Sequence, residues 1–159
     1  MGSWTRWIKV ATTSALLIAG GSAMALGKRV VLASEIEGQV VADASGAPVA
    51  GATVTRRWTW GLNDRTGTEQ TTTDAEGRFR FPPVEARSLG AALLPHEPGI
   101  RTEILLDRPG TEALLLLSLQ KKNYDPDGEL GGRKLSVRCR TDIEPGANGL
   151  FWGTCELVE

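Results

Sequence analysis

The chain has 159 residues, a length that suits one globular domain with an export segment better than two domains with separate cores. It carries 18 basic and 19 acidic residues, and this balance argues against a nucleic-acid-binding protein, which normally presents a basic face to phosphates. A single histidine and two cysteines are too few ligands for a zinc site, so neither a metal nor a cofactor is expected.

The first 25 residues are predicted to be a signal peptide. Arg6 and Lys9 form a basic start, residues 10–19 are mostly apolar, and small residues end in Ala23-Met24-Ala25. The apolar stretch is shorter than the roughly 20 residues that cross a bilayer, so no integral span is expected after cleavage. An uncleaved anchor is the alternative. Cleavage would remove two basic residues and no acid, which leaves a net charge of −3 on a chain expected in the periplasm or secreted.

Residues 36–159 are predicted to form one β domain, preceded over 28–34 by a linker or an edge strand. The first strand, 36–43, ends at a turn in which Gly46 can adopt positive φ and Pro48 fixes its own φ. A second strand is expected over 49–60.

The strand over 49–60 contains the first candidate binding residues. One interpretation is that Arg56, Arg57, Trp58 and Trp60 form an exposed platform for a protein or a glycan, since tryptophan and arginine are enriched at binding hot spots. The alternative is that both tryptophans are buried between two sheets. Strand alternation favours burial, because Trp58 and Trp60 share the parity of Val54.

The next two strands are expected over 67–73 and 78–81. The first of these contains four threonines and few large apolar side chains, which is typical of an edge or solvent-facing strand. The turn between them runs from Asp74, whose carboxylate can bind the backbone ahead of it, to Gly77. Strict alternation over 78–81 then places Phe79 and Phe81 inside the domain.

Residues 86–99 are predicted to be irregular, with one or two helical turns that begin at a Ser88 cap. Pro95 and Pro98 prevent the helix from continuing and flank His96 and Glu97. Acid–base catalysis would need a nucleophile or a second acid within reach, and the sequence contains no Gly-x-Ser-x-Gly, His-Glu-x-x-His or phosphate-loop motif. His96 is therefore expected to be structural, with a role in a partner interface left open.

Strands resume over 100–106 and 111–121. Residues 114–117 are apolar on both parities, which indicates a central strand covered on both faces; a helix is the alternative, since alanine and leucine are good helix formers. The turn-rich segment 123–132 includes the acidic run 125–129, which is interpreted as a solvated turn rather than a calcium loop because it lacks the ligand spacing of an EF-hand.

The last two strands are expected over 134–141 and 150–158, and they contain Cys139 and Cys155. In an oxidising compartment two such thiols usually form a disulfide, which here would tie adjacent strands or close a C-terminal hairpin. About eight short strands at this spacing predict an all-β sandwich of the immunoglobulin-like kind.

Three motifs resemble the carboxypeptidase regulatory-like domain. They are Glu37-Gly38-Gln39-Val40-Val41, then Ala47-Pro48-Val49-Ala50-Gly51-Ala52-Thr53-Val54, then Thr72-Thr73-Asp74-Ala75-Glu76-Gly77-Arg78-Phe79-Arg80-Phe81. The resemblance covers 36–84 and implies a transthyretin-like sandwich of seven strands. It leaves 85–159 as the remaining strands with a C-terminal disulfide hairpin, and it brings no catalytic residues.

The expected function is that of a non-catalytic periplasmic protein that binds a protein partner. Domains of the resembled family usually act as accessory or partner-binding modules, and some small envelope proteins of comparable design neutralise secreted toxins. An immunity-type role against a toxin effector is therefore the specific hypothesis. A structural or carbohydrate-binding envelope module is the alternative.

Overall fold

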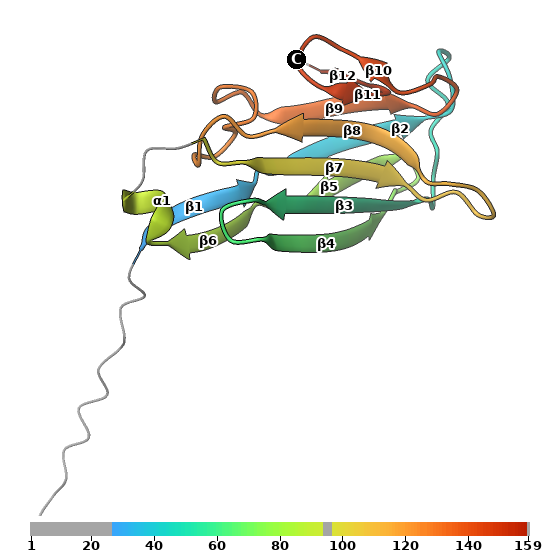
Figure 1. The fold of residues 1–159 in the computed structure, drawn as a ribbon. Coiled ribbons are helices and arrows are strands. Elements are labelled where there is room, and N and C mark those ends of the chain that lie inside the picture. The colour runs from blue at the N-terminus through green and yellow to red at the C-terminus, as the bar shows by residue number, and fades with distance from the viewer. Residues whose placement is uncertain (1–26, 94–96, 159) are drawn as a thin grey trace, which may run out of the picture.

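Twelve strands and one helical turn make up the described part of the chain, residues 27–93 and 97–158, in a computed structural model (Figure 1). In chain order they are β1 (Lys28–Ala33), β2 (Ile36–Val41), β3 (Thr53–Trp60), β4 (Arg65–Thr72), β5 (Arg78–Phe81), β6 (Val84–Ser88), α1 (Gly90–Leu93), β7 (Ile100–Leu106), β8 (Leu114–Gln120), β9 (Leu135–Arg140), β10 (Gly146–Ala147), β11 (Trp152–Gly153) and β12 (Cys155–Leu157). The predicted signal peptide, residues 1–25, lies outside the described residues.

Ten of these strands form the two layers of a β-sandwich. One sheet has the order β10-β11-β8-β7-β3-β4 and the other the order β12-β9-β2-β5, with β2 and β9 parallel. The predicted all-β sandwich is therefore confirmed, and so is the position of the threonine-rich strand β4 at a sheet edge. Among the described residues no helix is long and apolar enough to cross a membrane.

The turns that the sequence predicts are present. The Asp74 carboxylate accepts hydrogen bonds from the backbone N–H groups of Glu76 (3.0 Å) and Arg78 (2.7 Å), and Gly77 has a φ of 73°. Gly46 also adopts positive φ, at 79°. At the other end of the molecule the Ala91 N–H donates to the Ser88 hydroxyl (3.2 Å), so α1 has the serine cap that the sequence predicts.

The pairing of β1 with β6 corrects two expectations. Of the two alternatives for residues 28–34, the strand is correct and the linker is not, and the first three residues of the irregular region predicted over 86–99 also belong to a strand: β1 and β6 pair antiparallel as a ribbon of their own. Pro82-Pro83 does end β5, as predicted, but the chain then continues as β6. This ribbon follows on from the β2–β5 pair and covers the left-hand end of the sandwich in Figure 1.

Strand β8 confirms the strand interpretation of 114–120 and corrects its explanation. The pairing of β7 with β8 shifts register between Ile104 and Leu105, as a β-bulge. Because of this shift, Leu116 and Leu117 are both fully buried, while Leu115 on the outer side is only half-buried. The apolar run thus arises from a bulge rather than from cover on both faces of the strand.

The C-terminal segment changes sheets, so the single strand expected over 150–158 is divided. Residues 152–153 pair with β8 in the six-stranded sheet, whereas 155–157 pair with β9 in the four-stranded sheet. Cys155 lies directly opposite Cys139, and the two form a disulfide, as the sequence predicts. Both cysteines are buried in the core between the sheets.

Two hydrophobic clusters fill the interior. The larger lies between the sheets and includes the disulfide; the smaller contains Trp58, Trp60 and Tyr124, packed under β1 and β6. Trp58 also covers Gly67, its cross-strand neighbour on β4, and an added Cβ at Gly67 would lie 2.3 Å from the indole. The edge strand therefore has a glycine where a tryptophan ring needs the space.

Replacing that glycine is expected to disturb the smaller cluster. Gly67→Ala should lower the free energy of unfolding by about 1–3 kcal/mol, because the buried Trp58 ring must shift to admit the methyl group. Urea unfolding and the near-ultraviolet circular dichroism of the tryptophans measure this. Gly146→Ala is the matched control, since nothing lies within 4 Å of its added Cβ; equal losses in the two variants would contradict the prediction.

Candidate functional site

The structure places most of the residues predicted as a binding platform inside the protein. Arg56, Trp58 and Trp60 are 0%, 7% and 1% exposed, so these three cannot form the exposed platform, and the burial alternative is correct. Arg57 points outward from β3 and is exposed. His96 lies outside the described residues.

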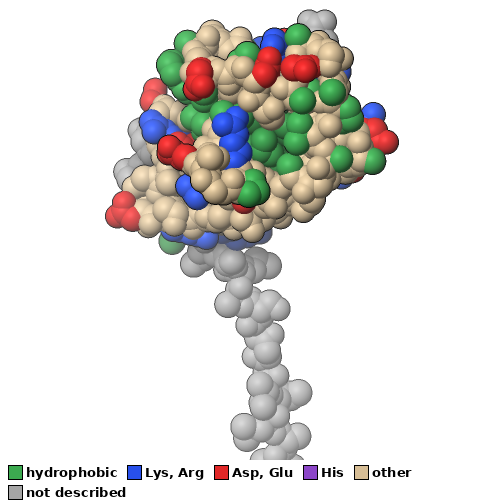
Figure 2. Space-filling model, turned by 90° about the vertical axis from the view of Figure 1, so that its right-hand side faces the viewer, with side chains coloured by type: hydrophobic (Ala, Val, Ile, Leu, Met, Phe, Trp, Pro, Cys, Tyr) green, Lys and Arg blue, Asp and Glu red, His purple; other side chains and the backbone are tan. Residues whose placement is uncertain are grey.

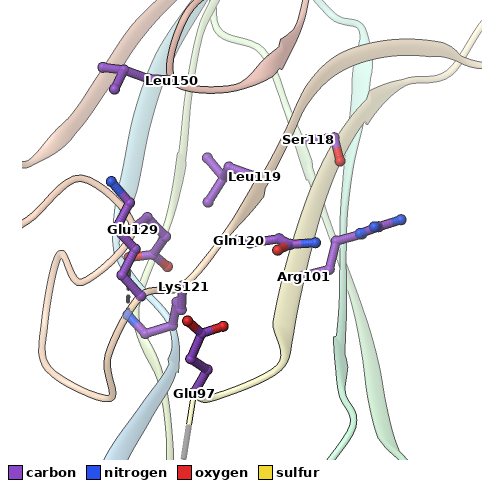
Figure 3. Close-up of a pocket in the computed structure, with 9 residues that line it drawn as sticks. Glu97, Arg101, Ser118, Leu119, Gln120, Lys121, Glu129 and Leu150 are labelled. Carbon is purple, nitrogen blue, oxygen red and sulfur yellow. Dashed lines mark hydrogen bonds and ion pairs between the residues drawn. The ribbon is translucent and has the colours of Figure 1, made fainter.

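A buried ionic cluster lies where the β1–β6 ribbon meets the sandwich. Lys121 Nζ lies 3.0 Å from Glu129 Oε2, and their side chains are 0% and 1% exposed (Figure 3). The Ser34 hydroxyl donates to the Glu129 carboxylate (2.5 Å) and accepts from Lys121 Nζ (3.0 Å). Two segments distant in sequence, the end of β1 and residues 121–129, are thereby joined.

Every polar atom at the centre of this cluster is engaged. Lys121 Nζ donates to Ser34, Glu129 and the Asp125 carbonyl, which accounts for its three hydrogens. The second oxygen of Glu129 accepts the Ser34 N–H (3.1 Å), and the Ser34 hydroxyl also accepts the Asp127 N–H (2.9 Å). Because both side chains are buried and each of their polar atoms already has a partner, we assign the pair a structural role.

Arg56 extends the buried cluster toward β4. Its guanidinium donates to Glu69 (Nε to Oε2, 2.7 Å) and to the carbonyls of Ser34 and Pro82, and it lies 4.9 Å above the centre of the Phe81 ring. Burial lowers the pKa of Arg56, and the hydrogen bond to Glu69 opposes this. The Arg56 guanidinium therefore links β3 of the sandwich to the residues that flank the β1–β6 ribbon, Ser34 and Pro82.

The acidic run 125–129 closes as the turn that the sequence predicts, but it is not fully solvated. Gly128 N–H donates to the Asp125 carbonyl (3.2 Å), while Glu129 points inward to Lys121. No group of three or more potential metal ligands occurs in the described parts of the chain.

The outer face of the six-stranded sheet carries the side chains best placed to bind a partner. One row crosses all six strands through directly paired residues: Thr68, Arg57, Glu103, Ser118, Trp152 and Ala147. Six strands span roughly 24 Å at the usual strand spacing. Thr59, Arg101 and Gln120 form a second row beside it. We call these two rows the outer face.

Trp152 is the aromatic residue of this surface, and the sequence analysis did not single it out. It is 51% exposed, on the short strand β11 beside Ser118. The sequence carried a partial signal: Phe151 and Cys155 share one parity and Trp152 has the other, although Thr154, on the parity of Trp152, is buried where the chain changes sheets. Arg57 and Trp152 lie in the same row three strands apart, with Glu103 and Ser118 between them, so this surface differs from the predicted platform with Trp58 and Trp60.

A cavity of about 690 Å³ adjoins the outer face at the edge of β8. Figure 3 shows Arg101, Gln120 and Ser118 projecting to one side of β8, with Leu119 and Lys121 on the other and Leu150 across the opening. Leu150 is 49% exposed and adds an apolar side chain to the lining of the cavity. The site combines an aromatic ring, two arginines and several neutral polar groups.

A second hollow lies at the opposite end of the sandwich from α1. Figure 2 views this end and shows hydrophobic side chains gathered around a basic one. The hollow of about 750 Å³ is lined by Val49, Ala52, Leu106 and Pro109, among others, and Arg108 donates across it to the Thr141 carbonyl (3.1 Å). Because that bond spans the hollow and exposed aromatic residues are absent from its lining, we place the candidate site on the outer face.

Comparison with known proteins adds a family but no activity. No curated protein matches the chain. Among solved structures, catechol 1,2-dioxygenase from Pseudomonas arvilla C-1 aligns with 83% of this chain at 21% identity and a TM-score of 0.37. The aligned region covers 50% of that enzyme's chain. A likeness this weak indicates neither a shared fold nor a shared activity. Residues 36–144 match a family described as a domain of unknown function, and the chain is therefore a member of the DUF6795 family.

Proposed function

We propose that this protein is a non-catalytic binding module of the bacterial envelope that captures a protein partner on its outer face. The exposed Trp152 carries the proposal. It lies in one continuous cross-strand row that also contains Glu103 and Arg57, and an exposed tryptophan that shares a surface with an arginine is typical of an interface anchor.

The charges of the row suit a protein surface of mixed sign. Arg57 and Glu103 are directly opposite on neighbouring strands, with Arg101 two residues along β7. Such alternation gives register and specificity to a docking partner rather than attraction to one sign of charge. A secreted toxin effector is the specific partner that we propose to test first, with export to the periplasm placing the two proteins in one compartment.

Removing the anchor is expected to weaken capture. Trp152→Ala and Arg57→Ala should each weaken partner binding at least tenfold, on the order of 2 kcal/mol for a hot-spot side chain. Affinity purification of the full chain from periplasmic extract, followed by titration of the recovered partner, measures this.

The matched control is Arg78→Ala, which removes another exposed arginine, on the outer side of the four-stranded sheet. It should retain the partner. Recovery of no stoichiometric partner by the unaltered chain, or equal binding by all three variants, would contradict the proposal.

A carbohydrate-binding envelope module is the second candidate, and the neighbours of Trp152 favour it specifically. Ser118 and Gln120 offer hydroxyl and amide groups beside the ring, which is how sugars are commonly oriented on an aromatic platform. Titration with peptidoglycan fragments distinguishes the two functions: a change in tryptophan fluorescence that disappears in Trp152→Ala would support the glycan.

A further inference from the structure

In the described part of the chain, the longest open edge of the two sandwich sheets belongs to β4. This strand is the last of the six-stranded sheet, and Figure 1 shows it as the lowest strand of the front sheet. The other strands at the borders of the two sheets, β10, β12 and β5, have two, three and four residues, whereas β4 has eight. The free edge of β4 therefore offers more backbone for pairing than any of these.

Half of the residues of β4 direct their backbone polar groups away from the sheet. Just after β4, the Thr73 N–H donates to the Ala52 carbonyl (2.9 Å) and the Thr73 carbonyl accepts the Gly51 N–H (3.0 Å). Odd-numbered residues therefore bond toward β3, because successive residues of an antiparallel strand bond to opposite sides. The residues whose N–H and C=O groups face the free edge are Thr66, Thr68, Gln70 and Thr72. Such a row is a template for pairing with another strand.

Strand β4 lacks most of the features that prevent edge pairing. Proteins protect open edges with lysine, proline, bulges or unpaired inward charges. The β4 sequence, Arg-Thr-Gly-Thr-Glu-Gln-Thr-Thr, contains neither lysine nor proline, and its register with β3 is regular throughout. The inward-facing Glu69 is paired with Arg56. The side chains at positions 66, 68, 70 and 72 are exposed and uncharged, so they do not repel a strand of the same composition.

We propose that two copies of the protein pair through the free edges of β4, antiparallel and about a two-fold axis at Thr68. A second copy fits because the same residues meet from both sides in compatible pairs. Thr68 then lies opposite Thr68 of the second copy and Thr66 opposite Gln70, so hydroxyl and amide groups face one another on the outer side. On the inner side Arg65 lies diagonal to Glu69 of the second copy, within reach of these long side chains.

The other antiparallel registers are less favourable. An axis at Glu69 would bring two carboxylates directly opposite each other. An axis at Gly67 would leave the last residues of β4 beyond the start of the second copy's strand. An axis between two residues would oppose a residue that faces the free edge with one that faces β3. Trp152 lies toward the opposite border of the sheet, so this inference does not rest on the proposed function.

Analytical ultracentrifugation of the purified full chain tests the pairing. The unaltered chain should show a concentration-dependent equilibrium between monomer and dimer, without larger species. Thr68→Pro should weaken the dimer about tenfold or more, because each copy loses a backbone donor at the axis. The Thr68 N–H faces away from β3, so proline removes no bond within the sheet and the circular dichroism spectrum should be retained.

The matched control for the proline variant is Thr68→Val. Valine keeps the backbone N–H and the branched shape of threonine and suits a strand. This variant should therefore dimerise nearly as well as the unaltered chain. Equal dimerisation by Thr68→Pro and Thr68→Val would contradict the proposal, because the contact between copies would then lie elsewhere.

Cross-linking tests the register and does not depend on the proline variant. Directly paired Cα atoms at the axis would lie about 5.5 Å apart, within the range of a disulfide, so Thr68→Cys should form a linked dimer under mild oxidation. Gln70→Cys is the matched control on the same edge and should stay unlinked, because Gln70 lies opposite Thr66. Mixing Thr66→Cys with Gln70→Cys should restore the link. The native cysteines are bridged and buried and do not compete.

Two further results would overturn the pairing. The first is an unaltered chain that sediments as a monomer up to its solubility limit; if its captured partner is then lost in Thr68→Pro, the free edge binds a strand of that partner instead of a second copy. The second is equal cross-linking by Thr68→Cys and Gln70→Cys, which would show that no fixed register exists.

Discussion

Lys121→Met is expected to destabilise the protein by about 3–5 kcal/mol, a large part of the stability of a domain of this size. The substitution preserves the length of the side chain but leaves the Glu129 carboxylate buried at 1% exposure without a cation. The Asp125 carbonyl and the Ser34 hydroxyl each lose a donor as well. Urea unfolding followed by tryptophan fluorescence measures the loss.

A double-mutant cycle identifies the cause. Lys121→Met combined with Glu129→Leu should be more stable than Lys121→Met alone, because the unpaired buried charge is removed. Lys122→Met is the matched control on the exposed neighbour, with a change within about 0.5 kcal/mol. Additive losses in the cycle, or a similar loss at position 122, would show that the buried ion pair is not the source.

Removal of the disulfide is expected to cost about 3 kcal/mol, the chain-entropy value for a loop of roughly 15 residues. Cys139→Ala with Cys155→Ala releases β12 from β9 at their direct pair, close to the point where the chain changes sheets. The short strand β11 and its Trp152 lie just before that point. Partner or glycan binding should therefore weaken together with stability.

The redox state supplies the control for this prediction. The unfolding midpoint of the unaltered chain should fall when a reductant is present during unfolding, whereas the double alanine variant should be insensitive to reductant. Reduction of the folded protein should be slow, because both sulfur-bearing residues are buried. If the double alanine variant is as stable as the oxidised unaltered chain, the disulfide does not provide the expected entropic stabilisation.

The candidate site could be predicted from the sequence only in part. Alternation along β3 places Trp58 and Trp60 with Val54, and this parity decides their burial. The same pattern leaves Arg57 exposed, as the structure has it. Trp152 belongs to the site because β11 pairs with β8 and brings it into the row of Arg57, a register that no local pattern specifies.

The buried ion pair was beyond sequence reasoning for a related reason. Lys121 and Glu129 lie in a segment rich in turn residues, where charged side chains are normally solvated. Ser34 comes from the far end of the chain and completes the hydrogen bonds that make their burial possible. Only the packing of the β1–β6 ribbon onto the sandwich removes water from these groups.

The amino-acid sequence by itself determined the local features of this protein: strand alternation, the Asp74–Gly77 turn, the serine cap of α1 and a pair of cysteines able to bridge. These depend on neighbours within a few residues, where sterics and hydrogen bonding act directly. The tertiary structure alone decided the pairing of β1 with β6, the bulge in β8, the change of sheets before Cys155 and the surface that Trp152 completes. Each of those joins segments far apart in the chain, and their register follows from the shared core rather than from any one segment.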